Sequence, residues 1–356
     1  MPGSRVDWRR FLQTFGPLLA LGLLIAGTAA VEAVRVPAEN RAFLTTRNFL
    51  NILGQWSFVG ITAIGMTFVI VRAGIDLSVG SMVALSGGAA VYAMNAVQER
   101  VEGESSLPVL TAVAVCLLTG PVLGLVNGLL VGVGRIAPFV ATLGTMAMFR
   151  ALILAPAQGG QIRSASGTFG EIARWGVNLP YALGGTPPEV MADGTTRPGI
   201  PLSVRAPVLA FVGLAAVAHV VLRHTAFGLR VTAIGDNARA ARYSGVRIPR
   251  MTLLVYTISG ATCGVAGLMV ASRMTSVASS SMGALYELDA IAAVVIGGTR
   301  LQGGSGRIWG TVVGVLILGV VGNMLNMLDV STFYHGLVKG LIIIAAVLLQ
   351  PAKPTD

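Results

Sequence analysis

The segment Arg72-Ala73-Gly74-Ile75-Asp76-Leu77-Ser78-Val79-Gly80 is a glycine-flanked polar break between two apolar stretches, which belong to the runs 49–71 and 76–96. A membrane helix needs about 20 apolar residues to cross a hydrocarbon core of ~30 Å, and both runs reach that length. A second break, Gly297-Gly298-Thr299-Arg300-Leu301-Gln302-Gly303-Gly304-Ser305-Gly306-Arg307, follows an apolar run too short to cross alone. Paired interrupted helices point to a transport path. Two short cytoplasmic turns explain the breaks equally well at this stage.

The composition places the chain in a membrane. Of its 356 residues, 54% are hydrophobic and 11% are charged, and the mean hydropathy is +0.77. Soluble domains carry about 25% charged residues, and a chain of this size could not bury so much apolar surface away from water. The composition therefore excludes a soluble enzyme, a disordered chain and a nucleic-acid-binding protein, in spite of a formal net charge of +10.

Ten apolar runs predict the fold class, which is an all-α polytopic membrane protein with about ten transmembrane helices, some of them interrupted. Residues 1–356 then form a single transmembrane domain embedded in the lipid bilayer. The first run follows three arginines and exceeds the ~7–15-residue apolar core of a cleaved signal peptide, which predicts an uncleaved signal-anchor. The runs are 16–34, 49–71, 76–96, 108–131, 137–155, 206–222, 251–271, 287–298, 308–328 and 332–350.

Charge placement predicts the orientation, because cytoplasmic loops of membrane proteins are enriched in Lys and Arg. With ten spans and an inside N-terminus, the inside segments hold 14 cations and four acids, whereas the outside segments and outer helix ends hold nine cations and eleven acids. Both termini are then cytoplasmic, and residues 1–15 form the cytoplasmic N-terminus. Residues 156–205 form a long loop on the outer, periplasmic side, and residues 223–250 form a cytoplasmic loop.

Cysteine, histidine and glycine patterns argue against catalysis by this chain. Cys116 and Cys263 lie within apolar runs, which predicts small buried hydrophobic side chains. The spacing of Cys and His predicts no metal site. The Gly303–Gly306 cluster lacks the Lys-Ser/Thr that follows the last glycine of a phosphate-binding loop. We therefore expect no enzymatic activity, no ATP hydrolysis and no cofactor in this chain.

The two long loops differ in what they predict. The outer loop, 156–205, has six prolines and nine glycines, so we expect little regular structure in it. It is either an exposed connector or a docking surface for an external partner, and its length favours the second interpretation. The inner loop, 223–250, holds six arginines. Two interpretations of these arginines remain open. The loop is basic only because cytoplasmic loops are enriched in arginine, or it forms a surface for a cytoplasmic partner.

A short helix is expected within the inner loop, over 236–245. Asp236 can cap its start by accepting a backbone N–H, and Gly245 suits its end. Such a helix contains only two turns, which are marginal in water unless they pack against a partner. The capped helix therefore favours partner docking over a plain basic loop.

Five polar residues near the apolar runs are candidates for the translocation pathway. Membrane carboxylates are costly and face the protein interior or water, so Asp76 is the first of them. Ser78 either lines the path or caps the following helix. The asparagines are explained equally well by the pathway and by hydrogen bonds between helices. They are Asn127, Asn323 and Asn326.

Five blocks of the sequence occur together in one known family. They are Gly65–Ile70 with Gly74–Ser81, Asn127–Leu129, Pro138–Gly144, Thr232–Asn237 and Tyr286–Thr299. In these blocks and in their order the chain resembles the permeases of ABC transporters of the ribose/xylose/arabinose/galactose type. The resemblance covers nearly the whole chain, from about residue 48 to residue 350.

The resemblance implies a multi-pass permease subunit in the bacterial inner membrane. Two copies would form a homodimer around the pathway for a monosaccharide, either a pentose or a hexose, or for a similar small polyol. A separate cytoplasmic ATP-binding subunit would bind ATP and Mg, and a periplasmic solute-binding protein would deliver the solute. The coupling helix of the family matches 236–245, which assigns five residues to contact with the ATP-binding subunit. They are Asp236, Asn237, Arg239, Arg242 and Gly245.

An ion-coupled secondary transporter of a small solute is the alternative, because such proteins also use interrupted helices. An ion relay needs ionisable residues within the spans. The runs contain few of these, mainly Arg150 and Lys339. The sequence therefore favours the ATP-driven importer.

Overall fold

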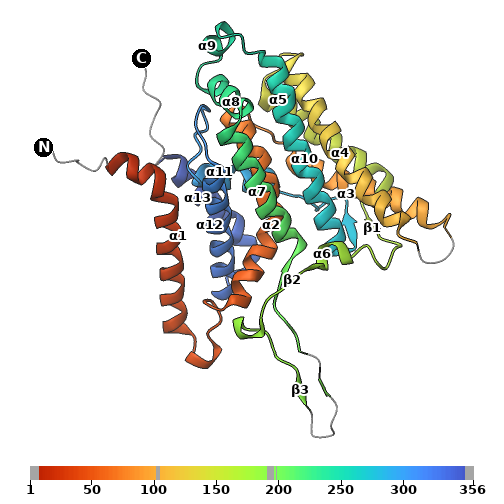
Figure 1. The fold of residues 1–356 in the computed structure, drawn as a ribbon, viewed down its shortest axis with the longest axis vertical. Helices are drawn as coiled ribbons and strands as arrows, with labels where there is room; N and C mark the ends of the chain where they lie inside the picture. Colours follow the sequence, from red (N-terminus) through yellow and green to blue (C-terminus); the bar gives the residue numbers. More distant parts are fainter. Residues whose placement is uncertain (1–7, 102–104, 191–195, 198, 349–356) are drawn as a thin grey trace, which may run out of the picture.

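The computed structural model describes residues 8–101, 105–190, 196–197 and 199–348 as a helical bundle with a β-hairpin arm at one end (Figure 1). All ten predicted apolar runs are confirmed as helices. Eight of these helices are long and apolar enough to cross a membrane, whereas α11 has 11 residues and α13 has 17. The ten are α1 (Trp8–Arg35), α2 (Thr46–Val71), α3 (Val79–Gln98), α4 (Leu107–Gly132), α5 (Pro138–Ala157), α7 (Ala206–His224), α10 (Ile248–Met274), α11 (Tyr286–Ile296), α12 (Ile308–Met327) and α13 (Thr332–Leu348).

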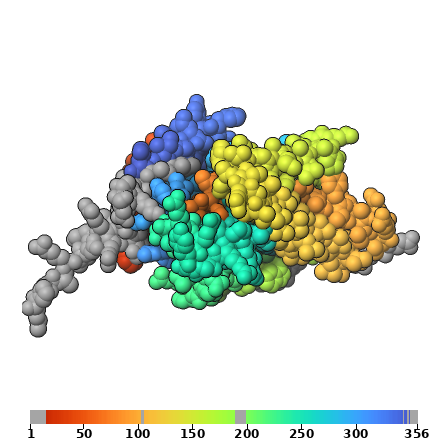
Figure 2. Space-filling model, turned by 90° about the horizontal axis from the view of Figure 1, so that it is seen from above, coloured from red at the N-terminus to blue at the C-terminus, as the bar shows by residue number. Residues whose placement is uncertain are grey.

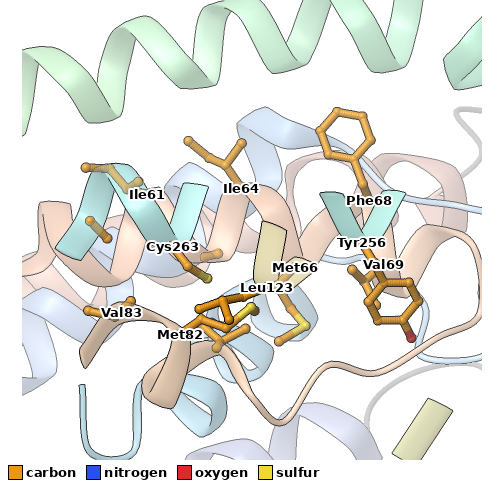
Figure 3. Packing of buried hydrophobic residues seen from close by; sticks show 14 of the residues in the cluster. Ile61, Ile64, Met66, Phe68, Val69, Met82, Val83, Leu123, Tyr256 and Cys263 are labelled. Atoms are coloured by element: carbon orange, nitrogen blue, oxygen red, sulfur yellow. The ribbon is translucent and has the colours of Figure 1, made fainter. Parts of the chain in front are cut away.

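Helix α10 lies at the centre of the bundle and packs against α2, α3 and α4. The contact with α4 is made by backbone, because Gly120 faces Gly260 and a side chain on either glycine would collide with the carbonyl of the other. Small residues at a helix crossing allow this close approach, and dispersion contacts then hold the pair together. Figure 3 shows how Met82, Leu123 and Cys263 pack into the same apolar cluster.

Both cysteines occupy this interior, as predicted. Cys263 and Cys116 are fully buried and free, and the Cys116 Sγ donates to the carbonyl oxygen of Gly264 at 3.1 Å.

The outer helices carry exposed apolar side chains. Large apolar side chains are exposed on α4, α5 and α7, such as Leu118, Leu152 and Val217. Exposed apolar side chains on several neighbouring helices suit contact with lipid.

The long loop 156–205 is more ordered than its composition suggested, and the expectation of little regular structure is wrong. Strands β2 (Gly176–Asn178) and β5 (Ser203–Arg205) pair antiparallel, as do β3 (Glu189–Val190) and β4 (Thr196–Arg197). Together they form the hairpin arm that extends from the bundle in Figure 1. Four described prolines of the loop fall between the strands, where a missing N–H breaks no ladder bond, for example Pro180, whereas Pro156 lies inside α5.

The root of the arm is tied to the bundle by a third strand pair. Strand β1 (Gln161–Arg163), just after α5, pairs with β6 (Ser276–Ala278), just after α10. A short helix, α6 (Glu171–Arg174), follows β1. The segment around α6 is held to α10 by Ser272, whose hydroxyl donates to the Phe169 carbonyl and accepts from the Ala173 N–H.

The opposite end of the molecule carries two short helices, α8 (Ala226–Asp236) and α9 (Ala238–Tyr243). Figure 1 places α9 at the end farthest from the arm. The predicted inner loop 223–250 and the predicted outer loop 156–205 therefore lie at opposite ends, as two loops on opposite sides of a membrane must. Which end faces the cytoplasm stays a prediction from the charges.

We expect Gly260→Val to destabilise the protein, because the new side chain forces α4 and α10 apart at their backbone contact. Overpacking of this kind costs about 1–3 kcal/mol. The measurement is thermal unfolding in mild detergent, with Gly144→Ala as the control, since a Cβ at Gly144 meets nothing within 4 Å. Equal melting temperatures for wild type and Gly260→Val would contradict the contact.

Candidate functional site

Asp76 is the centre of a buried polar network between α3, α4, α5 and α10. Its side chain is fully buried, and Oδ1 accepts from the Ser78 N–H at 3.0 Å and from the Ser78 hydroxyl at 2.6 Å. Oδ2 accepts from the Ser259 hydroxyl of α10 at 3.0 Å. Asn127 of α4 donates to the Ser78 oxygen at 2.7 Å and accepts from the Thr145 hydroxyl of α5 at 2.6 Å. The network joins four helices at the first break.

The Ser78 side chain does not cap α3, which is one of the two roles that the sequence allows for it. Its hydroxyl is directed to the Asp76 carboxylate instead of to the first turn of the helix. The physical reason is proximity, because Asp76 lies two residues before Ser78 and its Oδ1 is within hydrogen-bond distance of the Ser78 hydroxyl. The carboxylate of Asp76 also accepts the Ser78 backbone N–H, so the aspartate itself orders the start of α3.

The two remaining pathway candidates lie apart from this network, on α12. The Asn323 amide exchanges two hydrogen bonds with Asn48 of α2, at 3.1 and 2.9 Å. This is the hydrogen bond between helices that the sequence left open. Asn326 is exposed one turn further along α12. The structure thus brings together Asp76, Ser78 and Asn127, and their role in a pathway stays a prediction.

The two predicted breaks meet at one point, which we call the junction and define by Val71, Ala73, Gly235, Gly303 and Gly304. The N–H of Gly304, in the second break, donates to the carbonyl of Val71, at the end of α2, at 2.9 Å. A Cβ at Gly235 of α8 would collide with that same carbonyl oxygen. Gly303 packs against Ala73, and both have positive φ, of 83° and 65°. The ends of α2 and α8 and the second break are thus in backbone contact.

The predicted coupling residues follow the junction directly. Asn237, rather than Asp236, caps α9, because its Oδ1 accepts from the N–H groups of Arg239 and Ala240, each at 3.0 Å. Asp236 is the last residue of α8, whose continuation leaves the capping position one residue later than predicted. Gly245 has φ 83° after α9, in agreement with the predicted helix stop.

The outer face of α9 is open to the surroundings. Arg239 and Arg242 are exposed, and Tyr243 is 89% exposed, whereas Ala241 packs inward with 4% exposure. Figure 2, seen from the α9 end, shows this region in green to teal on the surface of the molecule. A basic face with a protruding tyrosine, held by a capped turn, is suited to contact with another protein.

Sequence reasoning missed an ion pair within the bundle. Lys339 of α13 donates to both carboxylate oxygens of Asp289 in α11, at 3.0 and 2.9 Å, and its Nζ lies 4.9 Å from the centre of the Trp56 ring in α2. Asp289 lies in one of the blocks that carry the family resemblance, and Lys339 lies within a predicted span. The available signal was therefore the rule that ionisable residues in a membrane pair with one another.

Arg150, the other ionisable residue within a predicted span, has a structural role. Its guanidinium donates to the carbonyl oxygens of Ser279 and Met282, at 3.0 and 2.9 Å. These contacts fix the segment between α10 and α11 against α5.

Comparison with known proteins identifies the family and the relatives of this sequence. The sequence matches the family described as branched-chain amino acid transport system / permease component over residues 48–347. It is 41% identical to the ribose import permease protein RbsC of Bacillus subtilis (strain 168), over 98% of this chain and 96% of that protein. It is 36% identical to RbsC of Escherichia coli (strain K12), over 99% and 100%, and 32% identical to the xylose transport system permease protein XylH of the same organism, over 94% and 92%. No solved structure matches it significantly.

The fold and these relatives define the class of protein, a multi-pass permease of the bacterial inner membrane. The chain belongs to the branched-chain amino acid transport system / permease component family. The resemblance to permeases of monosaccharide ABC importers is thereby confirmed, and it favours the ATP-driven class over the ion-coupled alternative.

We expect Asp76→Ala to lower stability strongly, because it leaves the Ser259 and Ser78 hydroxyls and the Ser78 N–H without their acceptor. Each buried donor left unpaired costs about 1–3 kcal/mol. Asp76→Asn keeps one acceptor oxygen and should lose less. Thermal unfolding of the two variants in detergent tests this order, with the exposed Asp329→Asn as the control. An unchanged melting temperature for Asp76→Ala would show that the network contributes nothing to stability.

Proposed function

We propose that the chain is the membrane-spanning permease subunit of an ATP-driven, binding-protein-dependent importer for a monosaccharide, with a pentose as the first candidate. The names of the relatives support the solute class, since the proteins compared are ribose and xylose permeases. The single structural observation that carries the proposal is the exposed, capped α9 held directly after the junction. This chain forms the pathway, and ATP and Mg bind to a separate subunit.

The ATP-binding subunit contacts α9 in this proposal. Arg239, Arg242 and Tyr243 supply the exposed surface, and the Asn237 cap holds the turn in shape. Movement of α9 reaches the spans through α8, because Gly235 of α8 touches the Val71 carbonyl without an intervening side chain. A contact between two backbones has little freedom to deform, so displacement at α9 is passed on to the end of α2.

The break between α2 and α3 is the element that such a displacement reaches first. It runs from the Val71 carbonyl at the junction to Asp76 in the buried network, five residues later. Packed helices rearrange between discrete states rather than deforming continuously. A shift of the break would thus change how α3, α4, α5 and α10 meet, which is the rearrangement that alternate opening of a pathway requires. Asp76, Ser78 and Asn127 position these helices, and Asn323 and Asn326 remain pathway candidates on α12.

The opposite end receives the periplasmic solute-binding protein in this proposal. The arm formed by β2 to β5 projects from that end, and the strand pair β1–β6 anchors its root. A homodimer of this chain would place two arms on the same side of the membrane. The arms and the neighbouring ends of the spans then form the surface on which one solute-binding protein docks.

Charge reversal on α9 tests the coupling surface. We expect Arg239→Glu with Arg242→Glu to abolish co-purification of the ATP-binding subunit in mild detergent, together with vanadate-sensitive ATPase activity, because the exposed basic face becomes acidic. The matched control is Arg100→Glu with Arg163→Glu, two exposed arginines at the other end of the bundle. Retention of the ATPase by the α9 variant would place the coupling surface elsewhere.

The energy source and solute class are tested by uptake in cells that carry the complete system. We expect uptake of labelled ribose to stop after ATP depletion and to survive an uncoupler, and unlabelled xylose to compete better than a hexose. The physical reason is that an ATP-driven importer draws no energy from an ion gradient. Uptake that survives ATP depletion and collapses with the uncoupler would assign the chain to ion-coupled transport.

A further inference from the structure

A cavity of about 480 Å³ lies beside the junction, at the α9 end of the bundle. It is bounded by the last turns of α7, by α8 and by the segment that leads from the second break into α12. Cavities of this size hold small organic ligands or headgroups. The polar and aromatic side chains that line it are His219, Arg223, Thr232, Ser305, Arg307 and Trp309.

The cavity has the electrostatics of an anion site. Arg223 and Arg307 are exposed, and within the described part of the chain neither forms an ion pair. The lining residues include no Asp or Glu, and Asp236 is the carboxylate next to the Gly304 wall. The Arg307 guanidinium lies 5.8 Å from the centre of the Trp309 ring, which restrains that side chain at the rim. Two arginines that are free to pair suit a phosphate group.

Next to the cavity, towards the middle of α7, the exposed surface is apolar. Val212 and Ala216 lie on the same face of α7 as His219 and Arg223, by helical spacing, and both are exposed, with Val212 at 56%. Leu229 of α8, 72% exposed, adds an apolar side chain to the cavity itself. An occupant that fits both parts has an anionic head and a hydrocarbon tail.

The cavity also lies at the ends of two helices that are long and apolar enough to span a membrane, where lipid headgroups are expected. Helix α7 is long and apolar enough to cross a membrane, and Arg223 and His224 are in its last turn. Trp309 is in the first turn of α12 at the same end, and tryptophan is enriched at the membrane–water boundary. Basic pockets between membrane helices on the cytoplasmic side bind the headgroups of anionic lipids.

We propose that this cavity is a binding site for an anionic phospholipid, whose phosphate pairs with Arg223 and Arg307 and whose acyl chains lie along α7. A soluble phosphate compound shares the chemistry of the headgroup but has no hydrocarbon tail to contact the apolar face of α7. The Gly304 wall of the cavity is part of the junction, where it bonds to Val71 and packs against Asp236. A bound lipid therefore stabilises the contact through which α8 meets α2.

The test uses the purified full chain in detergent, with binding measured by native mass spectrometry and stability by thermal unfolding. The probes are phosphatidylglycerol, phosphatidylcholine with the same acyl chains, glycerol phosphate and inorganic phosphate. We expect phosphatidylglycerol to bind and to raise the melting temperature, because a ligand that binds only the folded state stabilises it. Phosphatidylcholine and the two soluble phosphates should have little effect.

Three double variants localise the site and test its charge. Arg223→Gln with Arg307→Gln should weaken phosphatidylglycerol binding about tenfold, because each basic residue near an anionic headgroup contributes to binding. Arg135→Gln with Arg250→Gln removes the same charge at the same end, outside the cavity, and should bind like wild type. Arg223→Lys with Arg307→Lys should retain most of the binding, which separates loss of charge from loss of fold.

Three outcomes would overturn the proposal. Equal phosphatidylglycerol affinity in the glutamine variant and the wild type would place the lipid elsewhere. Full stabilisation by glycerol phosphate or inorganic phosphate would show a site for a soluble anion. Displacement of the lipid by a co-purified ATP-binding subunit would assign the cavity to that protein. Each outcome is independent of which solute the permease carries.

Discussion

The carbonyl oxygen of Val71, at the end of α2, is the point on which the arrangement of this bundle depends. It accepts the N–H of Gly304 at 2.9 Å, and the backbone of Gly235 approaches it so closely that a side chain there would collide with it. Three segments distant in sequence are thus fixed by backbone alone. Side chains can adopt other rotamers to relieve strain, whereas a backbone contact of this kind can be lost only when whole segments move. The termini of α2 and α8 and the second break are therefore constrained to move together.

A second constraint is that polar groups within the bundle must be satisfied by one another. Asp76 is surrounded by donors from several helices, and Lys339 finds both oxygens of Asp289. Apolar side chains in a membrane give little preference for one helix partner over another, because lipid is as apolar as leucine. The polar contacts, the amide pair of Asn48 and Asn323 among them, therefore specify which helices are neighbours.

Much of this architecture could be predicted because composition and span length act locally. All ten helices were found from runs of apolar residues, and Gly245 marked the end of α9 correctly. The cap shifted from Asp236 to Asn237 because α8 extends further than propensity indicates. The hairpin arm was missed since its strands are short and pair across about 25 residues of Pro/Gly-rich sequence. The partners of Asp289 and Asn323 depend on tertiary contacts, which no local pattern contains.

The strand pair β1–β6 has a consequence for the synthesis of the protein. Gln161 of β1 donates to the hydroxyl of Ser276 in β6, a partner 115 residues further along the chain. Closing so long a loop is slow compared with forming a helix, and α7 and α10 are made between the two strands. The ribosome must therefore release β6 before the root of the arm can form. Until β6 has been synthesised, β1 remains an unpaired strand edge. Chaperones and proteases can recognise such an edge.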